Sequence, residues 1–239
     1  MRSAVFSPDS SNVADLFYLV QTCIQKKGTP VFSKNLTVNF DSKVNVKLQI
    51  KASELKNFIR KNKFNSVHCF MIDMSAASGK QRFFVYNLKK DSIEMAGLVT
   101  HGSGSVTANK ELYFSNVPGS NCTSLGKYKI GIPYHGRFGL AYKLHGLETT
   151  NNKAFERFVV LDAHSCVPDS EVYPLPICPS LGCPTVAPEF LVKLQEYISA
   201  SRNPVLLNIY KWFFKTLQIV PILFDHLQWP AQNIFLQEG

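Results

Sequence analysis

The chain has 239 residues, of which 45% are hydrophobic and 18% are charged. This balance excludes disorder, collagen-like repeats and a coiled coil, and it predicts a globular protein dominated by one domain. A net charge of +9 favours an anionic partner such as a nucleic acid, a membrane surface or a carboxylate-rich polymer. Because the basic residues are dispersed rather than interleaved with aromatic residues, we expect no nucleic-acid binding.

The first expected elements are a hairpin and a short helix. Apolar and polar residues alternate with period two between residues 34 and 51, which predicts a half-buried β-hairpin. Apolar residues at helical spacing follow Ser53, and they predict an amphipathic helix that ends near Lys61. We therefore interpret residues 1–64 as an N-terminal segment packed on the main domain.

A strand-rich domain is expected over residues 65–210. Apolar, β-branched and aromatic runs separated by turn residues predict a meander at 67–74, 82–88 and 92–101. Further strands are expected in KYKIGI, GLAYKLHGL, FERFVVLDAHSCV and VLLNIY. EFLVKLQEYIS, after Pro188, has the apolar spacing of one clear helix. The predicted fold class is mostly β, of the α+β type.

Both ends of the chain contain apolar segments that could indicate export or membrane contact. The apolar run at 13–23 contains an acidic residue and lacks a basic flank, so no cleavable signal peptide is expected. The tail at 211–239 is aromatic and apolar but is interrupted by charges and prolines. We expect it to pack on the domain rather than span a membrane, with contact to a membrane surface as the less favoured alternative.

The densest set of reactive side chains lies between Asp162 and Val186. Ser180, Leu181 and Gly182 directly precede Cys183. A glycine there allows a sharp turn that aims successive backbone N–H groups at an oxyanion. His164 can fold back to act as the base for a Cys183 nucleophile.

Other interpretations of these cysteines stay open at this point. A cysteine after glycine is more often a small buried hydrophobe than a nucleophile. His164, Cys166, Cys178 and Cys183 could bind zinc, although the spacing lacks the tight knuckles of structural zinc sites. Cys166 and Cys178 could instead form a disulfide that leaves Cys183 unpaired.

Two long connections are candidates for a binding groove. The segment at 102–126 is rich in Gly, Ser and Asn and is longer than a structural connection needs to be. We expect it and the loop at 165–182 to flank one groove that contains Cys183. The candidate groove residues lie in the first segment or at the ends of predicted strands, and they are His101, Asn116, Ser120 and His145.

Several motifs in order carry a resemblance to a known family. They are FMIDMSAASGKQRFFVYNL, LVTHGSGS, FSNVPGSNCTSLGKYKI, KLHGLETTNNKAFERFVVL and PSLGCPTV. From about Ser66 to Ile209 the chain resembles the murein L,D-transpeptidase catalytic domains of bacterial peptidoglycan synthesis. The resemblance implies a β-sandwich or meander with one helix after the catalytic Cys box.

The resemblance also implies a mechanism. Cys183, made a thiolate by a nearby His, would attack a stem tetrapeptide and release D-Ala. Transfer of the acyl group to a second stem would form a 3→3 cross-link. With water as the acceptor, the protein would be an L,D-carboxypeptidase. Backbone N–H groups near Gly182 would hold the oxyanion, with Ser180 shaping the turn. The resemblance implies no metal or organic cofactor. It implies that the partner is the peptidoglycan stem peptide and that the protein is located in the cell envelope or periplasm. Carbapenems are expected inhibitors.

One departure from the family pattern concerns the base. The family's catalytic His corresponds to Asp162, and the nearest His is His164. Alternation along a strand places residues 162 and 164 on one face, so we expect His164 to be the base and Asp162 its neighbour. The alternative is a non-catalytic peptidoglycan-binding protein of the same fold, impaired by Asp162.

Overall fold

The computed structural model describes residues 42–109 and 111–212. Its elements in chain order are α2 (Ser42–Lys61), β1 (His68–Asp73), β2 (Phe83–Asn87), β3 (Ser92–Gly97), the 3₁₀ turn η1 (Ser103–Ser105), β4 (Gly126–Gly136), β5 (Gly139–Gly146), β6 (Val160–Ala163), β7 (Thr185–Val186), α3 (Pro188–Ser199) and β8 (Leu206–Tyr210). The predicted mostly β fold class is confirmed, and the described residues contain two α-helices, at the N-terminal side of the sheet in sequence and after the Cys turn.

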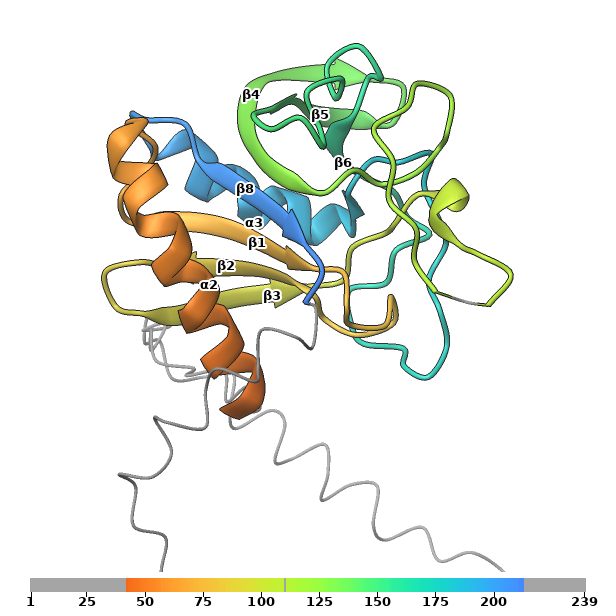
Figure 1. The fold of residues 1–239 in the computed structure, drawn as a ribbon, viewed down its shortest axis with the longest axis horizontal. Helices are drawn as coiled ribbons and strands as arrows, with labels where there is room; N and C mark the ends of the chain where they lie inside the picture. The colour runs from red at the N-terminus through yellow and green to blue at the C-terminus, as the bar shows by residue number, and fades with distance from the viewer. Residues whose placement is uncertain (1–41, 110, 213–239) are drawn as a thin grey trace, which may run out of the picture. The chain divides into compact units, whose positions relative to one another are not determined.

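The strands form one eight-stranded sheet in the order β3-β2-β1-β8-β4-β5-β6-β7 (Figure 1). The pairs β1–β8 and β6–β7 are parallel, whereas the other neighbours are antiparallel. Although β8 comes last in sequence, it lies between β1 and β4. The meander β1–β3 is therefore joined to the hairpin β4–β5 through the last strand.

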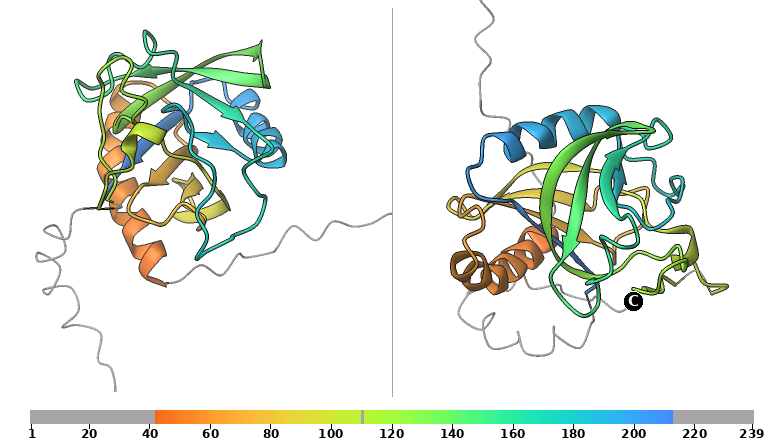
Figure 2. Two further views of the ribbon diagram at one scale, coloured as in Figure 1. Left: turned by 90° about the vertical axis from the view of Figure 1, so that its right-hand side faces the viewer. Right: turned by 90° about the horizontal axis from the view of Figure 1, so that it is seen from above.

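The two helices cover opposite faces of the β1–β3 and β8 part of the sheet (Figures 1 and 2). Alternate residues of β1 show the division, because Cys69 and Met71 pack with α2, while Phe70 and Ile72 pack with α3. The core on the α3 side continues under β4, β5 and β6. This larger core supports the strands that carry the residues predicted to be catalytic.

The predicted hairpin at 34–51 is wrong over residues 42–51, which form the first half of α2. The buried residues of α2 are Leu48, Ala52, Leu55 and Ile59. Their spacing of three or four positions defines one helical stripe. Val46, which belongs to the alternating pattern, is exposed. Burial of the helical stripe against the sheet outweighs the local β-like alternation. The predicted helix end at Lys61 is confirmed.

The other predicted elements of the core domain are found close to their predicted positions. The meander forms as β1, β2 and β3, the next candidates form β4, β5 and β6, VLLNIY forms β8, and the helix after the Cys box is α3. The two-residue strand β7 was not predicted. The predictions for residues 1–41 and for most of the tail, 213–239, lie outside the described residues.

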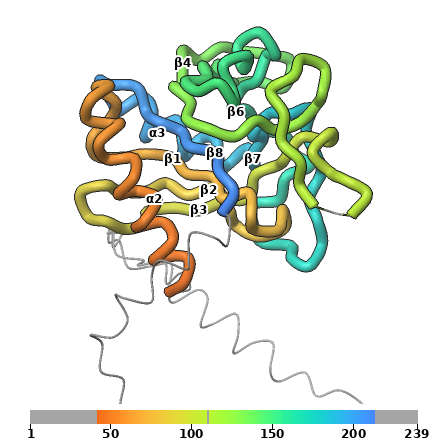
Figure 3. The backbone as a smooth tube through the Cα atoms, in the orientation of Figure 1, coloured from red at the N-terminus to blue at the C-terminus, as the bar shows by residue number. Residues whose placement is uncertain are grey.

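Within 42–109 and 111–212 no helix is long and apolar enough to cross a membrane. The long connections after β3 and β6 run on the same side of the fold (Figure 3). They touch directly, since the N–H of Ser180 donates to the carbonyl of His101 at 2.9 Å and the N–H of Ser103 donates to the carbonyl of Ser180 at 2.7 Å.

Candidate active site

The turn that carries Cys183 is fixed by hydroxyl groups. The Ser180 hydroxyl donates to the Cys183 carbonyl at 2.6 Å and accepts from the N–H of Gly182 at 3.2 Å. Thr100 donates to the same carbonyl at 3.0 Å. Gly182 has a φ of +114°, a conformation that favours glycine. Leu181 at the tip of the turn is exposed, and the Cys183 side chain is partly buried at its base.

The sulfur of Cys183 bonds to backbone groups of one short segment. The N–H of Val160 lies 3.4 Å from Sγ, and the thiol lies 3.8 Å from the carbonyl oxygen of Phe158. Burial, with a smaller contribution from the charge of Asp162, raises the pKa of Cys183 to about 11, against the opposing effects of the Val160 N–H and Arg157. The expected low-pKa thiolate is therefore wrong for this conformation, in which the thiol is protonated at neutral pH.

Asp162 belongs to a row of residues that crosses four strands. Tyr134 pairs with Ala141, Ala141 with Asp162, and Asp162 with Thr185. The Thr185 hydroxyl donates to Asp162 Oδ1 at 2.7 Å. Burial raises the pKa of Asp162 despite this hydrogen bond. Burial and the charges of Asp162 and Cys183 also raise the pKa of Tyr134, so these three groups face a common space.

His164 lies beside Asp162 but does not bond to the thiol. The N–H of His164 donates to the Val186 carbonyl at 3.1 Å, which continues the pairing of β6 with β7. The charge of His164 lowers the pKa of Asp162. His164 Nδ1 accepts from the N–H of Cys166 at 3.1 Å. Among the described residues, no hydrogen bond joins an imidazole to the Cys183 sulfur.

The neighbouring cysteines are paired with each other. Cys166 and Cys178 form a disulfide across 12 positions, as one of the sequence alternatives proposed. The zinc alternative is wrong, because both thiols are consumed by this bond. No cluster of three or more His, Cys, Asp or Glu side chains suited to a metal occurs in 42–109 or 111–212.

Arg157 is a site residue that sequence reasoning missed. Its guanidinium donates to the carbonyl of Ser115 at 3.0 Å, to the Ser124 hydroxyl at 3.2 Å and to the carbonyl of Cys122 at 2.6 Å. A Cβ at Gly182 would lie 2.8 Å from that Cys122 oxygen. Arg157 therefore fixes the segment against which the Cys turn packs. No motif pointed to it, because its role depends on three carbonyl and hydroxyl partners distant in sequence.

Asn116 and Ser120, two of the predicted groove residues, have structural contacts in the first long segment. Asn116 Nδ2 donates to the Thr149 carbonyl at 3.0 Å and to Asn152 Oδ1 at 2.7 Å. The Ser120 hydroxyl accepts from the N–H of Cys122 at 3.4 Å. These bonds shape the segment and anchor it to the turn that precedes β6.

The two predicted groove histidines occupy separate places. The His145 ring stacks on Phe155 with 5.1 Å between centroids. His101 Nδ1 lies 3.0 Å from the guanidinium of the fully buried Arg82, in a cavity of about 910 Å³ that Cys183 does not line. Burial and the Arg82 charge lower the pKa of His101 to about 4. The side chains of His101 and His145 thus contact Arg82 and Phe155, while the backbone carbonyl of His101 accepts from the N–H of Ser180 in the Cys turn.

A smaller pocket of about 260 Å³ is lined in part by two residues whose backbone contacts the Cys183 sulfur. Its lining residues are Tyr134, Lys143, Phe155, Phe158, Val159 and Val160. Phe158 and Val160 supply the backbone groups that contact the sulfur. The side chain of Phe158 is 83% exposed, and its φ of +55° is an unusual conformation for a bulky residue. The Cys183 sulfur therefore contacts backbone groups of two residues that also line this pocket, although Cys183 itself is not one of the lining residues.

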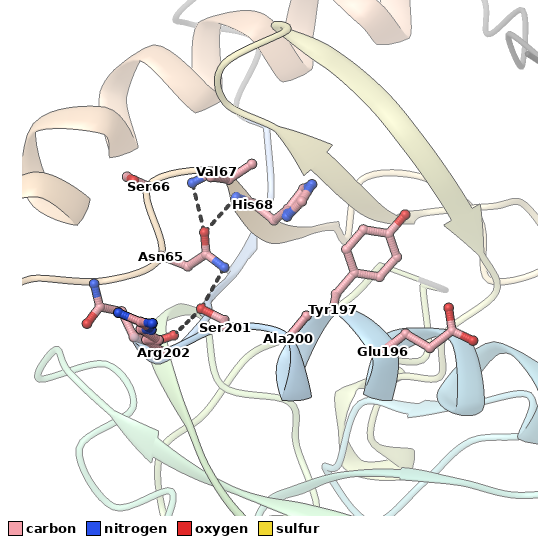
Figure 4. A pocket seen from close by; sticks show the side chains of 10 residues that line it. Asn65, Ser66, Val67, His68, Glu196, Tyr197, Ala200, Ser201 and Arg202 are labelled. Atoms are coloured by element: carbon pink, nitrogen blue, oxygen red, sulfur yellow. Dashed lines mark hydrogen bonds between the residues drawn. The ribbon is translucent and has the colours of Figure 1, made fainter. Parts of the chain in front are cut away.

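A larger hollow of about 510 Å³ lies at the far end of α3 (Figure 4). The Asn65 side chain accepts from the N–H groups of Val67 and His68 and donates to the Ser201 hydroxyl. His68 Nε2 lies 3.0 Å from a carboxylate oxygen of Glu94. The named polar side chains are bonded to one another, and α3 separates them from the Cys turn, so this hollow is not part of the candidate active site.

A family model described as the L,D-transpeptidase catalytic domain matches residues 41–207. The chain belongs to the L,D-transpeptidase catalytic-domain family. The match includes α2, the thiol turn and all but the last three residues of β8. It confirms the family to which the motifs pointed, and it begins before the domain boundary expected at residue 65.

Solved structures show weak overall similarity to this chain. The cell-shape-determining protein Pgp2 of Campylobacter jejuni is 10% identical, with 62% of this chain and 48% of that chain covered and a TM-score of 0.39. A mutant of Pgp2 from the same organism is also 10% identical, with 73% of this chain and 58% of that chain covered and a TM-score of 0.42. An L,D-transpeptidase from Xylanimonas cellulosilytica is 13% identical, with 64% of this chain and 68% of that chain covered and a TM-score of 0.33. The chain thus spans about half the length of the Pgp2 chains. No curated protein matches the sequence.

Proposed function

We propose that this L,D-transpeptidase domain acts on peptidoglycan stem peptides through an acyl-enzyme at Cys183. The observation that carries the proposal is the position of Cys183 Sγ, which accepts from the N–H of Val160, a residue that lines the small pocket. The sulfur would attack the carbonyl before the terminal D-Ala, and the peptide C–N bond would break. D-Ala leaves with the proton lost by the thiol. An acceptor amine then breaks the thioester and restores the thiol.

We assign the proton transfer to Asp162 rather than to His164. Asp162 is the carboxylate whose charge acts on the thiol, and burial raises its pKa, which makes it a better proton acceptor than an exposed aspartate. His164 acts on the carboxylate, since its charge lowers the pKa of Asp162. The N–H of Gly182 is bonded to Ser180, so the N–H of Cys183 is the proposed oxyanion donor.

Location in the cell envelope follows from this proposed substrate. The Cys166–Cys178 disulfide supports it, because such bonds persist in oxidising compartments. The net charge of +9 also suits a polymer rich in carboxylates.

Intact-mass spectrometry after incubation with a carbapenem tests the proposal. We expect one adduct per chain, mapped to Cys183 and absent from Cys183→Ser. Release of D-Ala from a stem tetrapeptide should be lost in the same variant. Cys69 and Cys122 are buried unpaired thiols, so Cys122→Ser is a matched control that should retain the adduct. A label on any other cysteine would contradict the assignment.

A second candidate function is binding of stem peptides without acylation. The raised pKa of Cys183 and the lack of a bond from an imidazole to its sulfur favour this candidate. It predicts that stem peptides bind to wild type and Cys183→Ala equally while no carbapenem adduct forms. The same mass experiment therefore separates the two functions.

A further inference from the structure

The cavity that His101 lines contains a buried positive charge that the proposed chemistry does not use. Its volume is about 910 Å³, and it shares no described lining residue with the small pocket near the Cys183 sulfur. The polar side chains of Arg82 and His101 belong to its wall. Its apolar lining residues are Met74, Ala76, Ala77, Leu112, Pro174 and Pro176. Such a cavity, with mostly apolar walls and a few placed polar groups, has the properties of a small-molecule site.

Within the described residues, the guanidinium of Arg82 bonds to neutral acceptors. Nε and Nη2 donate to the Val99 carbonyl at 3.0 and 2.8 Å, and Nη1 donates to the Ala76 carbonyl at 3.2 Å. The charge of Asp73 acts on Arg82, but Asp73 Oδ1 accepts from the N–H and the hydroxyl of Ser75. No ion pair to Arg82 is formed in 42–109 or 111–212. A fully buried cation therefore lacks an anion in contact with it.

His101 presents a fixed N–H donor at the wall of this cavity. Nη2 of Arg82 lies 3.0 Å from His101 Nδ1. Because a guanidinium only donates, Nδ1 accepts, and the proton of the neutral ring is on Nε2. Burial and the Arg82 charge lower the pKa of His101 to about 4, so this tautomer persists at neutral pH. No group of the described residues bonds to Nε2, although His101 is only 9% exposed.

The other charges of the cavity wall do not neutralise Arg82. They are Glu111 and Lys211, whose charges are opposite and cancel in sum. A ligand anion that accepts from His101 Nε2 would satisfy the open donor and lie near the buried guanidinium. Hydrogen bonds to an ionised acceptor are roughly twice as strong as those between neutral groups, so the site favours an anion over a neutral carbonyl.

We propose that this cavity binds a small carboxylate with an apolar body, through a hydrogen bond from His101 Nε2 to the carboxylate. Arg82 orients the imidazole and supplies the positive charge behind it. The apolar walls contact the rest of the ligand. The inference goes beyond the proposed function, because neither Cys183 nor a stem peptide takes part in this binding.

Hexanoate and hexanamide are matched probes of this site, since they share one apolar chain and differ in charge at its end. NMR titration at neutral pH, with the histidine side chains isotope-labelled, follows His101 directly. We expect hexanoate to shift the His101 Nε2 signal saturably and to bind about tenfold more tightly than hexanamide, as for one charge-assisted contact. The protein without either probe should already give the nitrogen signals of the Nε2–H tautomer. Absence of a saturable shift at His101 would overturn the inference.

His101→Phe should abolish the preference for hexanoate, because it keeps a ring but removes the donor. His145→Phe is the matched control, since His145 stacks on Phe155 and does not line this cavity. It should keep the preference. Equal binding of the two probes to wild type, or a preference that survives His101→Phe, would overturn the inference. If that surviving preference is lost on adding Lys211→Met, the anion binds Lys211 and the assignment to His101 is wrong. Should His101→Phe fail to fold, the His101 signals of wild type decide the question.

Two states of Cys183 separate this inference from the proposed function. Hexanoate should bind to wild type and to Cys183→Ser with equal affinity. A carbapenem adduct at Cys183 should also leave the affinity unchanged, whereas competition between them would place the ligand in the candidate active site and overturn the inference. If no adduct forms while the preference for hexanoate holds, the proposed function fails and the carboxylate site stands.

Discussion

The hydroxyl of Thr185 holds the carboxylate of Asp162 across the parallel strands β7 and β6 at a distance of 2.7 Å. This bond links the strand just after the Cys turn to the position where the family pattern expects a histidine. It holds a carboxylate, rather than an imidazole, at a position whose charge raises the pKa of Cys183.

Two substitutions of Asp162 should change the rate of Cys183 acylation in opposite directions. Removing the charge in Asp162→Asn should lower the pKa of Cys183, since the carboxylate raises it, while slowing acylation by about 100-fold if Asp162 is the base. Asp162→His should instead increase carbapenem acylation. The pH dependence of iodoacetamide alkylation measures the first effect, and adduct formation over time measures the second. Unchanged acylation in Asp162→Asn would refute the assignment of the base.

Loss of Arg157 should make the thiol less acidic. Its guanidinium charge lowers the pKa of Cys183, so Arg157→Met should move the alkylation profile to higher pH. Arg157→Lys keeps the charge but cannot make the forked contacts to Ser115 and Cys122. We therefore expect the Lys variant to keep much of the alkylation profile yet lose thermal stability. Identical profiles for wild type and Arg157→Met would argue against this electrostatic role.

The Cys166–Cys178 disulfide should stabilise the native chain. For a closed loop of 12 positions, the double variant Cys166→Ser/Cys178→Ser should lose about 3 kcal/mol of unfolding free energy. Urea unfolding measures this loss. Reductant should lower the stability of wild type toward that of the variant and have no effect on the variant. The variant should also release the Cys166 N–H bond that holds His164, which a shift in the His164 imidazole NMR signals would reveal.

Stability should fall with acid because of His101. Its pKa is about 4 in the folded protein, below the ordinary value of 6.5, so the unfolded chain binds more protons between these values. The contribution is fully present above pH 6.5 and is lost as the pH falls toward 4, up to about 3 kcal/mol. His101→Gln has no imidazole to titrate. The difference in unfolding free energy between wild type and His101→Gln should therefore change through this window, and a constant difference would contradict the prediction.

Much of the fold could be predicted because the strands of the core have regular apolar patterns. β1 to β6 and α3 follow local signals that agree with their final burial. Residues 42–51 were mispredicted because Val44, Val46, Leu48 and Ile50 fit both a strand and part of a helix. The decisive residues, Ala52, Leu55 and Ile59, lie beyond the alternating run. Only packing against the sheet selects between the two patterns.

The site was predictable to the extent that it is local in sequence. Ser180, Gly182 and Cys183 form one turn, and its shape follows from glycine and hydroxyl chemistry. The contributions of Arg157 and Phe158 depend on strand register and on contacts between distant segments, which no local pattern encodes. His101 and His145 do end or flank strands as expected, yet their side chains meet Arg82 and Phe155 instead of the thiol.

The place of β8 in the sheet also constrains how the protein is made. A ribosome releases β1 to β7 and the Cys turn before β8, yet β8 supplies the neighbour for both β1 and β4. Until Leu206–Tyr210 has emerged, those two strands have unpaired edges, which are prone to associate with other chains. The nascent chain therefore depends on β8 to join the meander to the hairpin β4–β5. Synthesis must pass residue 210 before the turn that carries Cys183 lies beside a finished sheet.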